Sequence, residues 1–358
     1  MVIAVNTRFI STDDPEGYGD IMYELFSRIT KKNSKHEFLF VFDKPYRGPL
    51  IFEKNVKTVV IRPSSRNALL QKYWIDVKLP AVLKKYKADL FISFDGKCSL
   101  TVKLPQCLLL SRPARSPRYL SKSNSIVAVS SFLRQDTIDR FIIDADNISV
   151  IPVAAKKNFR ELNDEEKTGV KNNLTGGREY FIYAGPLQMH SNLVNLLKAF
   201  SIFKKRQMSN WKLVLTGKPG RNYDALARSL ENYKYRDDVI LLPYNENSDI
   251  AGIMASAYAM IYPHFDSGPA IQVLEAMQSA IPVIASEDPV VKEIAGEAVL
   301  YIDPAKPEDI GEKMMLLYKD ENLRGRLIEK GKMIGGKHDW DTSAELLWQN
   351  IRKTIRSS

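Results

Sequence analysis

Short apolar runs alternate with amphipathic stretches along the first half of the chain. Helical patterns such as Tyr18–Ile29 and Ala68–Tyr86 separate several of these runs. Runs of this length with helices between them predict parallel strands that are covered by helices on both faces. The predicted strands are Val2–Val5, Glu37–Phe42, Val56–Ile61, Leu90–Phe94, Cys107–Leu110, Ile126–Val129 and Ile148–Ile151.

The same alternation starts again after residue 178. The second series of predicted strands is Tyr180–Ala184, Trp211–Thr216, Val239–Leu242, Ala259–Tyr262, Pro282–Ala285 and Val299–Ile302. The segment Ala154–Arg178, rich in Lys, Asn, Glu and Gly, is interpreted as the hinge between the two series. Trp340–Ile355 is predicted to be a last amphipathic helix, with Asp339 or Asp341 as its cap. The pattern predicts an α/β protein with two doubly wound, Rossmann-like domains.

Length and composition agree with two ordinary globular domains. A chain of 358 residues is too long for one ordinary core, and its 44% apolar and 26% charged residues are typical of globular proteins. No run of about 18 apolar residues is present, and MVIAVNTRF resembles a first strand more than a signal peptide. Only Cys98 and Cys107 occur, which fits a reduced, cytoplasmic setting better than a disulfide framework or a zinc site.

The net charge of +10 is concentrated in the first half of the chain. Residues 1–165 hold 27 Lys and Arg against 18 Asp and Glu, whereas residues 166–358 hold 25 against 24. This asymmetry indicates that the first domain meets an anionic surface or substrate, although charge for solubility explains it equally well. No nucleic-acid motif accompanies the charge. Candidate contacts to an anionic membrane are Lys31, Lys32, Lys35, Lys84, Lys85 and Lys87.

Three predicted turns between a strand and the next helix contain glycine. These are Gly17–Gly19 before the first helix, Ala184–Pro186 after one strand, and Asp266–Pro269 before another helix. A single glycine there is usually only a turn. Three at the same end of parallel strands favour a diphosphate ligand, because glycine allows close approach and the next helix offers free N–H groups.

Glu275 interrupts an apolar stretch that begins at Ile271 and ends at Met277. A carboxylate in that place is expected to be partly buried, which costs free energy unless hydrogen bonds satisfy it. The hydroxyls of a ribose would supply such bonds. The alternative is a glutamate on the solvent face of an amphipathic helix.

Several segments resemble the retaining glycosyltransferases of family 4. FIYAGPLQMHSNLVNLLKAF resembles the opening of that family's second domain, and DSGPAIQVLEAMQSAIPVIAS resembles its most diagnostic stretch. VKEIAGEAVLYIDPAKPEDIGEKM resembles the segment that follows. SIVAVSSFLRQDTIDRF and NISVIPVAA resemble the last strands of the first domain, and HDWDTSAELLWQNI resembles the C-terminal helix that returns to it.

The resemblance implies the GT-B arrangement, in which two Rossmann-like domains face each other across a cleft. Residues 1–155, with the helix 341–358, would then hold the acceptor, and residues 156–340 would bind the donor. The implied reaction moves a hexose, with retention, from a nucleotide-diphosphate sugar to an acceptor hydroxyl, in the assembly of a cell-surface polysaccharide or glycolipid. The acceptor would be lipid-linked or a glycan, and the basic first domain favours the inner membrane face as its place. No cofactor and no obligatory metal are implied.

The sequence departs from the family pattern at the expected donor site. The first of the family's two glutamates, eight positions before Glu275, falls on Ser267, with Asp266 beside it. The basic pair that holds the diphosphate falls on His190 and Ser191. One explanation is a remodelled site. The other is a GT-B protein that has lost catalysis and acts as a non-enzymatic partner of another transferase.

In a remodelled site, Asp266 would contact the sugar, and Lys218 or Arg221 would contact the phosphates. The N–H groups of Gly185 and Gly268 would also stabilise the leaving diphosphate. The residues predicted to be catalytic are Asp266 and Ser267, and those predicted to bind the donor are Gly17, Gly19, Gly185, Gly217, Lys218, Arg221, Gly268 and Glu275.

Overall fold

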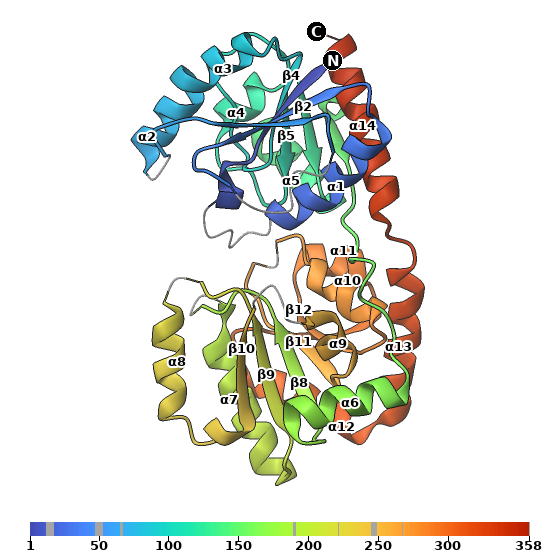
Figure 1. Cartoon of the computed structure of the whole chain (residues 1–358). Helices are drawn as coiled ribbons and strands as arrows, with labels where there is room; N and C mark the ends of the chain where they lie inside the picture. Colours follow the sequence, from blue (N-terminus) through green and yellow to red (C-terminus); the bar gives the residue numbers. More distant parts are fainter. Residues whose placement is uncertain are drawn as a thin grey trace. The chain divides into compact units, whose positions relative to one another are not determined.

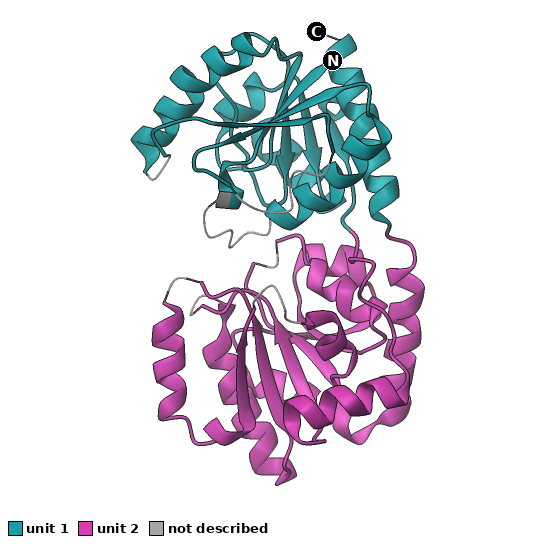
Figure 2. Ribbon diagram, viewed as in Figure 1, with its two compact units in different colours: residues 1–153, 339–358 teal, residues 154–338 magenta. Residues whose placement is uncertain are grey.

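The chain folds into two compact units. The computed structural model describes residues 1–11, 18–46, 53–64, 67–188, 191–220, 222–244, 249–266 and 268–357. Unit 1 comprises Met1–Val153 and Asp339–Ser358, and unit 2 comprises Ala154–His338 (Figure 2). The backbone therefore passes between the units twice, and unit 2 is inserted into the sequence of unit 1.

Unit 1 is built on a parallel sheet of seven strands in the order β3-β2-β1-β4-β5-β6-β7 (Figure 1). The strands are β1 Val2–Asn6, β2 Glu37–Phe42, β3 Val56–Val60, β4 Leu90–Ser93, β5 Gln106–Leu110, β6 Ser125–Ala128 and β7 Ile148–Val150. The helices are α1 Tyr18–Lys32, α2 Ala68–Tyr73, α3 Leu79–Lys85, α4 Pro117–Lys122, α5 Ser131–Phe141 and α14 Trp340–Arg356. Helix α14 packs on α1 and also contacts β5 and β6.

The helix predicted over Ala68–Tyr86 is interrupted. A π-helical segment, η2 (Trp74–Lys78), lies between α2 and α3, and the N–H of Leu79 donates to the carbonyl of Trp74, five residues earlier. Pro80 lies in the first turn of α3 and has no N–H to continue a regular α-helical ladder. The proline therefore accounts for the break.

Unit 2 has a parallel sheet of six strands in the order β10-β9-β8-β11-β12-β13. The strands are β8 Tyr180–Ala184, β9 Lys212–Gly217, β10 Val239–Pro243, β11 Ala259–Tyr262, β12 Val283–Ser286 and β13 Val299–Ile302. The helices are α6 Asp164–Thr175, α7 Leu193–Gln207, α8 Tyr223–Glu231, α9 Ile250–Ala255, α10 Ile271–Gln278, α11 Pro289–Ala295, α12 Pro307–Lys319 and α13 Glu321–Gly335.

Part of the segment predicted to be a hinge is helical. Helix α6 lies within Ala154–Arg178 and begins with a capping box, in which the Asn163 side chain accepts from the Glu166 N–H and the Glu166 carboxylate accepts from the Asn163 N–H. Thr175 is the one residue of this helix that is buried. The capping box and three acidic residues in the first turn stabilise this helix. It was not predicted because its composition is polar.

Aromatic side chains fill the core of each unit. In unit 1, Phe26 meets Phe38, Phe40 and Phe94 edge to face, with ring centroids about 6 Å apart. In unit 2, Phe181 on β8 packs against Phe203, Trp211 and Tyr258. These clusters pack α1 against β2 and α7 against β8.

The α/β fold and both predicted series of strands are confirmed. Each of the thirteen predicted strands is present, and its ends agree with the prediction to within one residue. Asp339 caps α14 by accepting from the Thr342 N–H, which settles the choice between Asp339 and Asp341. Among the described helices, none combines the length and the apolar character needed to cross a membrane.

Candidate functional site

Each sheet contains one place where the order of the strands reverses. In unit 2 the chain runs from β8 outward to β10 and then returns to β11 on the other side of β8. In unit 1 the corresponding strands are β1 and β4. Ligands of open parallel sheets bind beyond the carboxyl ends of the strands at such a reversal. The loops after β8, β11, β1 and β4 are therefore the places to look for a site.

The loops after β8 and β9 are in close backbone contact at Gly185 and Gly217. The N–H of Gly185 donates to the Thr216 carbonyl at 3.0 Å, and the N–H of Leu187 donates to the Lys218 carbonyl at 2.9 Å. A Cβ on Gly217 would lie 1.7 Å from the carbonyl oxygen of Gly185. Glycine is therefore required at position 217, and Gly185, Gly217 and Lys218 form one surface at the end of the sheet.

The turn after β8 is fixed from inside the fold. The Tyr183 hydroxyl and the Ser191 hydroxyl both donate to the Pro186 carbonyl, at 3.1 and 2.6 Å. Burial raises the pKa of Tyr183, so this hydroxyl stays protonated and remains a donor. Ser191, which falls where the family that the sequence resembles has a basic residue, is buried and stabilises this turn.

Asn192 ties three loops together and was not singled out from the sequence. Its side-chain amide is buried and donates to the carbonyls of Pro263 and Pro304, at 2.8 and 2.7 Å. These carbonyls belong to the loops after β11 and β13. Asn192 itself has a left-handed backbone, with φ of 59°, a conformation that asparagine tolerates better than most residues. An asparagine directly before an apolar helix was the available signal.

His264, also missed, links the loop after β11 to the turn after β8. Its ring centroid lies 4.3 Å from that of Tyr262 and 5.6 Å from that of Tyr183. A Cβ on Gly185 would come within 3.3 Å of its Nε2 atom. The two loops at the strand reversal of unit 2 are thus in direct contact, and Gly185 lies against both.

Asp266 and Gly268 form a turn on the same loop. Asp266 is exposed, and its Oδ1 atom accepts from the N–H of Gly268 at 3.1 Å. Gly268 is buried and has a φ of 56°, which favours glycine. Helix α10 begins three residues later. The side chain predicted to reach the sugar thus lies at the surface beside the start of a helix.

The N–H groups of Gly185 and Gly268 both have acceptors in this conformation, and their contact to a diphosphate stays a prediction. The first donates to the Thr216 carbonyl and the second to Asp266. A diphosphate would have to compete with these two acceptors for the N–H groups. Lys218, by contrast, is exposed, and its ammonium group makes no ion pair with any described residue.

Glu275 lies on the inner face of α10. Its side chain is 6% exposed, and its helix neighbours Val273, Leu274, Ala276 and Met277 are buried too. The alternative of a solvent-facing glutamate is therefore excluded. A contact to ribose remains a prediction.

Some predicted site residues cannot be placed. Gly17, Ser267 and Arg221, together with His190, lie outside the described residues. Gly19 belongs to the first turn of α1, which begins at Tyr18, and not to the loop before it. In the described ranges, no group of three or more His, Cys, Asp or Glu side chains is arranged to hold a metal ion.

The strand reversal of unit 1 carries a buried polar network that the sequence did not reveal. Asn6 at the end of β1 donates to the Ser93 hydroxyl at 3.0 Å, and Ser93 donates to Asp95 at 2.8 Å. Asp95 also forms an ion pair with Arg8, whose side chain is 4% exposed. The register of β1 and β4, which pairs Asn6 with Ser93, brings these residues together.

The pKa of Asp95 is set by two opposing effects. Burial raises it, but the charge of Arg8 and hydrogen bonds from Arg8 and Ser93 outweigh burial and hold the pKa below its usual value. Asp95 is therefore a carboxylate at neutral pH. A buried ion pair that is also hydrogen-bonded fixes the positions of the loops that follow β1 and β4.

Comparisons with known proteins place the fold. The structure of a glycosyltransferase from Rickettsia africae superposes with a TM-score of 0.79 at 13% identity, over 100% of this chain and 99% of that one. The Anabaena protein Alr3699/HepE in complex with UDP and glucose gives 0.77 at 14% identity, over 99% and 100%. Both agree with a GT-B fold.

The relatives found by sequence match only part of the chain. The O-antigen chain mannosyltransferase B of Escherichia coli is 25% identical over 238 residues, which are 64% of this chain and 62% of that protein. The O-antigen chain mannosyltransferase RfbU of Salmonella typhimurium is 24% identical over 186 residues, or 52% and 48%. The chain thus matches less than two thirds of the length of either relative.

One family model matches the second unit. It is described as "Glycosyl transferases group 1" and covers residues 164–333, from the start of α6 to the end of α13. This range holds the strand reversal at β8 and β11, the glycine pair and Glu275. Unit 2 is thus similar to the group 1 glycosyl transferases over most of its length.

Proposed function

We propose that the chain transfers a hexose, with retention, from a nucleotide-diphosphate sugar to an acceptor hydroxyl in the assembly of a cell-surface polysaccharide or glycolipid. Unit 2 binds the donor and unit 1 binds the acceptor, which is lipid-linked or a glycan. The observation that carries the proposal is the strand reversal of unit 2. There, the loops after β8 and β9 come together at Gly185 and Gly217. The same part of the chain carries the buried Glu275 and matches a glycosyl transferase family.

The donor's parts are assigned to different loops. The diphosphate lies against Gly217, with Lys218 as its cation, and Arg221 is a second candidate cation. The first turn of α10 adds the partial positive charge of a helix N-terminus. Glu275 accepts hydrogen bonds from the ribose, which binds without reacting. Asp266 and Ser267 contact the hexose.

Catalysis rests on charge that develops on the departing diphosphate. Cations that are fixed before the reaction stabilise this charge without reorganisation at the moment of transfer. No metal is assigned a part in this step, because the family resemblance of the sequence implies no obligatory metal. The two relatives named above are mannosyltransferases by name, so mannose is the first hexose to test.

A binding screen tests the proposal. Thermal unfolding is measured with UDP, GDP, ADP and CMP sugars, among them GDP-mannose, because a ligand at 100 times its Kd stabilises the fold by about 2.7 kcal/mol. One nucleotide is expected to bind, and its sugar is expected to be transferred to an acceptor extract. If no nucleotide sugar binds at millimolar concentration, the enzyme assignment fails and the non-enzymatic partner becomes the better description.

A further inference from the structure

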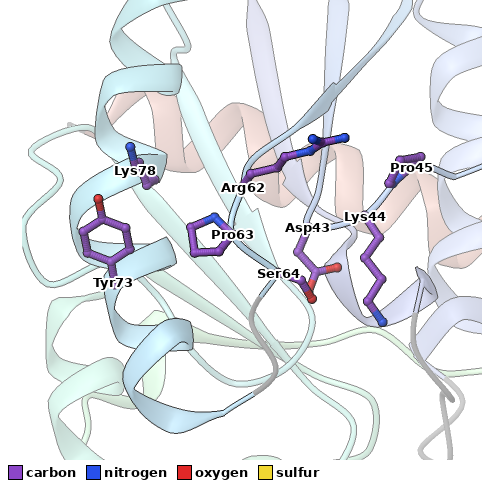
Figure 3. A pocket seen from close by; sticks show the side chains of 8 residues that line it. All are labelled: Asp43, Lys44, Pro45, Arg62, Pro63, Ser64, Tyr73 and Lys78. Atoms are coloured by element: carbon purple, nitrogen blue, oxygen red, sulfur yellow. The ribbon is translucent and has the colours of Figure 1, made fainter.

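A cavity of about 550 Å³ opens at the carboxyl ends of β2 and β3 in unit 1 (Figure 3). Its volume falls within the range of about 300–1,000 Å³ that is usual for small-molecule sites. It lies at the carboxyl edge of the sheet, which is the edge that binds ligands in such folds, and β2 is the neighbour of β1 at the strand reversal. Residues from the ends of both strands and from the helix that follows line it, and those that matter here are Asp43, Lys44, Arg62, Ser64, Tyr73 and Lys78.

The wall that carries Tyr73 and Lys78 is anchored to the strands. Trp74, which is fully buried, donates from its indole nitrogen to the Ile61 carbonyl at 3.2 Å. The N–H of Ile61 in turn donates to the Phe42 carbonyl at 2.8 Å, which extends the ladder of β2 and β3 by one residue. This wall of the cavity is therefore held in place within the fold, which lowers the entropy cost of binding.

The π-helical segment presents Lys78 to this cavity. Insertions of this kind in helices occur frequently at functional sites. The ammonium group of Lys78 lies 5.6 Å from the centroid of the Tyr73 ring, and the two side chains are neighbours in Figure 3. Tyr73 is 40% exposed, so part of its ring is available to pack against a ligand.

The lining carries more positive than negative charge. Lys44, Arg62 and Lys78 contribute three cations, and none of them forms an ion pair within the described part of the chain. The carboxylate of Asp43 opposes them, but Asp43 is 2% exposed and accepts from the Ser64 hydroxyl at 3.3 Å. The charge that a ligand meets is therefore mainly positive, and a guanidinium is well suited to a carboxylate or a phosphate.

Two lysine clusters of unit 1 lie elsewhere. Lys31, Lys32 and Lys35 are at the end of α1, and Lys84, Lys85 and Lys87 are at the end of α3. Both helices end where the chain enters the next strand, so these lysines belong to the amino-terminal edge of the sheet. Lys44 and Arg62 directly follow strands and belong to the opposite edge, where a ligand is expected.

We propose that this cavity binds the anionic group of an acidic sugar, a carboxylate or a phosphate monoester, in the glycan acceptor. Arg62, Lys44 and Lys78 contact the anion, and the Tyr73 ring packs against the sugar. The identification of this sugar as part of the acceptor rests on the function proposed above.

Protection of lysines from acetylation tests the inference directly. The full chain is treated with an amine-reactive acetylating reagent, with and without mannose 6-phosphate, glucuronate or neutral mannose, and modification of each lysine is followed by mass spectrometry. The two acidic sugars are expected to protect Lys44 and Lys78 but not Lys84 and Lys205. Arg62→Gln is expected to weaken the apparent affinity about tenfold, the effect of losing one charge-assisted hydrogen bond. Lys84→Gln should leave it unchanged.

Three results would overturn the inference. They are equal protection by neutral mannose, an unchanged affinity in a folded Arg62→Gln variant, and protection only by undecaprenyl phosphate in micelles, which would identify a lipid phosphate in place of an acidic sugar. Nucleotide binding is measured separately and should be the same in Arg62→Gln as in the native protein. If nucleotides bind and protection fails, only this inference falls. If protection occurs and no nucleotide binds, the anion site stands and the proposed transferase function falls.

Discussion

The α-carbon of Gly217 faces the carbonyl of Gly185 so closely that a Cβ at position 217 would lie 1.7 Å from that oxygen. The obstacle is backbone, which cannot rotate away as a side chain does. Gly217→Ala is therefore expected to separate the loops after β8 and β9, to cost about 1–3 kcal/mol of unfolding free energy, and to weaken nucleotide binding. Urea unfolding and calorimetry measure the two effects.

Gly169 provides the control for this substitution. It lies in α6, and a Cβ there would meet nothing within 4 Å. Gly169→Ala should stabilise the protein by about 0.5–1 kcal/mol, because alanine has the higher helix propensity, and should leave nucleotide affinity unchanged. A Gly217→Ala variant that behaves like Gly169→Ala would show that the two loops separate without cost.

Glu275→Ala should weaken nucleotide binding by about 1–3 kcal/mol, since a charge-assisted hydrogen bond to the ribose is lost. Calorimetry with the nucleotide found in the screen measures the change. Glu312→Ala, in the exposed part of α12, is the matched control. Unchanged affinity in a folded Glu275→Ala variant would assign this buried carboxylate to the architecture of α10.

Asp266→Asn should abolish sugar transfer and spare binding of the bare nucleotide, because only the contact to the sugar is removed. Asparagine keeps an oxygen for the hydrogen bond with the Gly268 N–H, so the turn is preserved. Initial rates of transfer and the Kd of the nucleoside diphosphate are the two measurements. Native rates of transfer in the variant would remove Asp266 from the reaction.

Asp95→Asn should destabilise unit 1 by about 3–5 kcal/mol at neutral pH, because Arg8 remains buried without its counter-charge. The pH dependence follows from the lowered pKa of Asp95. The stabilisation by the charged form is fully present above the unfolded value, near 3.8, and is lost as the pH falls through the folded value. The difference between the native protein and Asp95→Asn should thus narrow below about pH 4.

Asp136→Asn is the control for this experiment. Asp136 pairs with Arg140 at the surface of α5, and such pairs contribute about 1 kcal/mol or less. Urea unfolding from pH 3 to pH 7 provides the comparison. A constant difference between the native protein and Asp95→Asn over this range would mean that the charge of Asp95 does not stabilise the fold.

Binding to acidic lipid vesicles tests the role of the basic clusters of unit 1. If they contact a membrane, co-sedimentation should occur at low salt and fall steeply by about 0.1 M, where the Debye length is about 10 Å. A Lys84→Gln, Lys85→Gln double variant should bind more weakly than one with Lys205→Gln and Arg206→Gln in unit 2. Absence of binding at low salt would leave a soluble acceptor or solubility as the reason for the charge.

Strands were easier to predict than the site. A strand such as Ile126–Val129 is buried on both faces, so its residues form one continuous apolar run that is visible in the sequence. The burial of Glu275 was predicted for a related reason, because its neighbours along α10 are apolar. Both features depend on residues that are close in the sequence.

Features that depend on long-range register could not be predicted. Arg8 and Asp95 are 87 positions apart, and only the pairing of β1 with β4 brings them together. The N–H of Gly185 donates to the Thr216 carbonyl because β8 pairs with β9, and no local sequence pattern reveals this pairing. Pro80 is a local signal for the break in the helix at Trp74–Lys78. The position of Lys78 in the cavity, however, depends on the neighbouring strands β2 and β3.

The insertion of unit 2 into unit 1 determines when each unit can fold during synthesis. Residues 154–338 are contiguous, so unit 2 has its whole sequence as soon as they leave the ribosome. Unit 1 must wait for α14, whose Trp348 and Ile351 are buried and whose Asn350 accepts from Ser125. The usual order, in which the N-terminal part is completed first, is therefore reversed. Until α14 arrives, the surfaces of α1, β5 and β6 that it covers stay exposed, and nascent chains stalled before residue 339 should be the ones that chaperones hold.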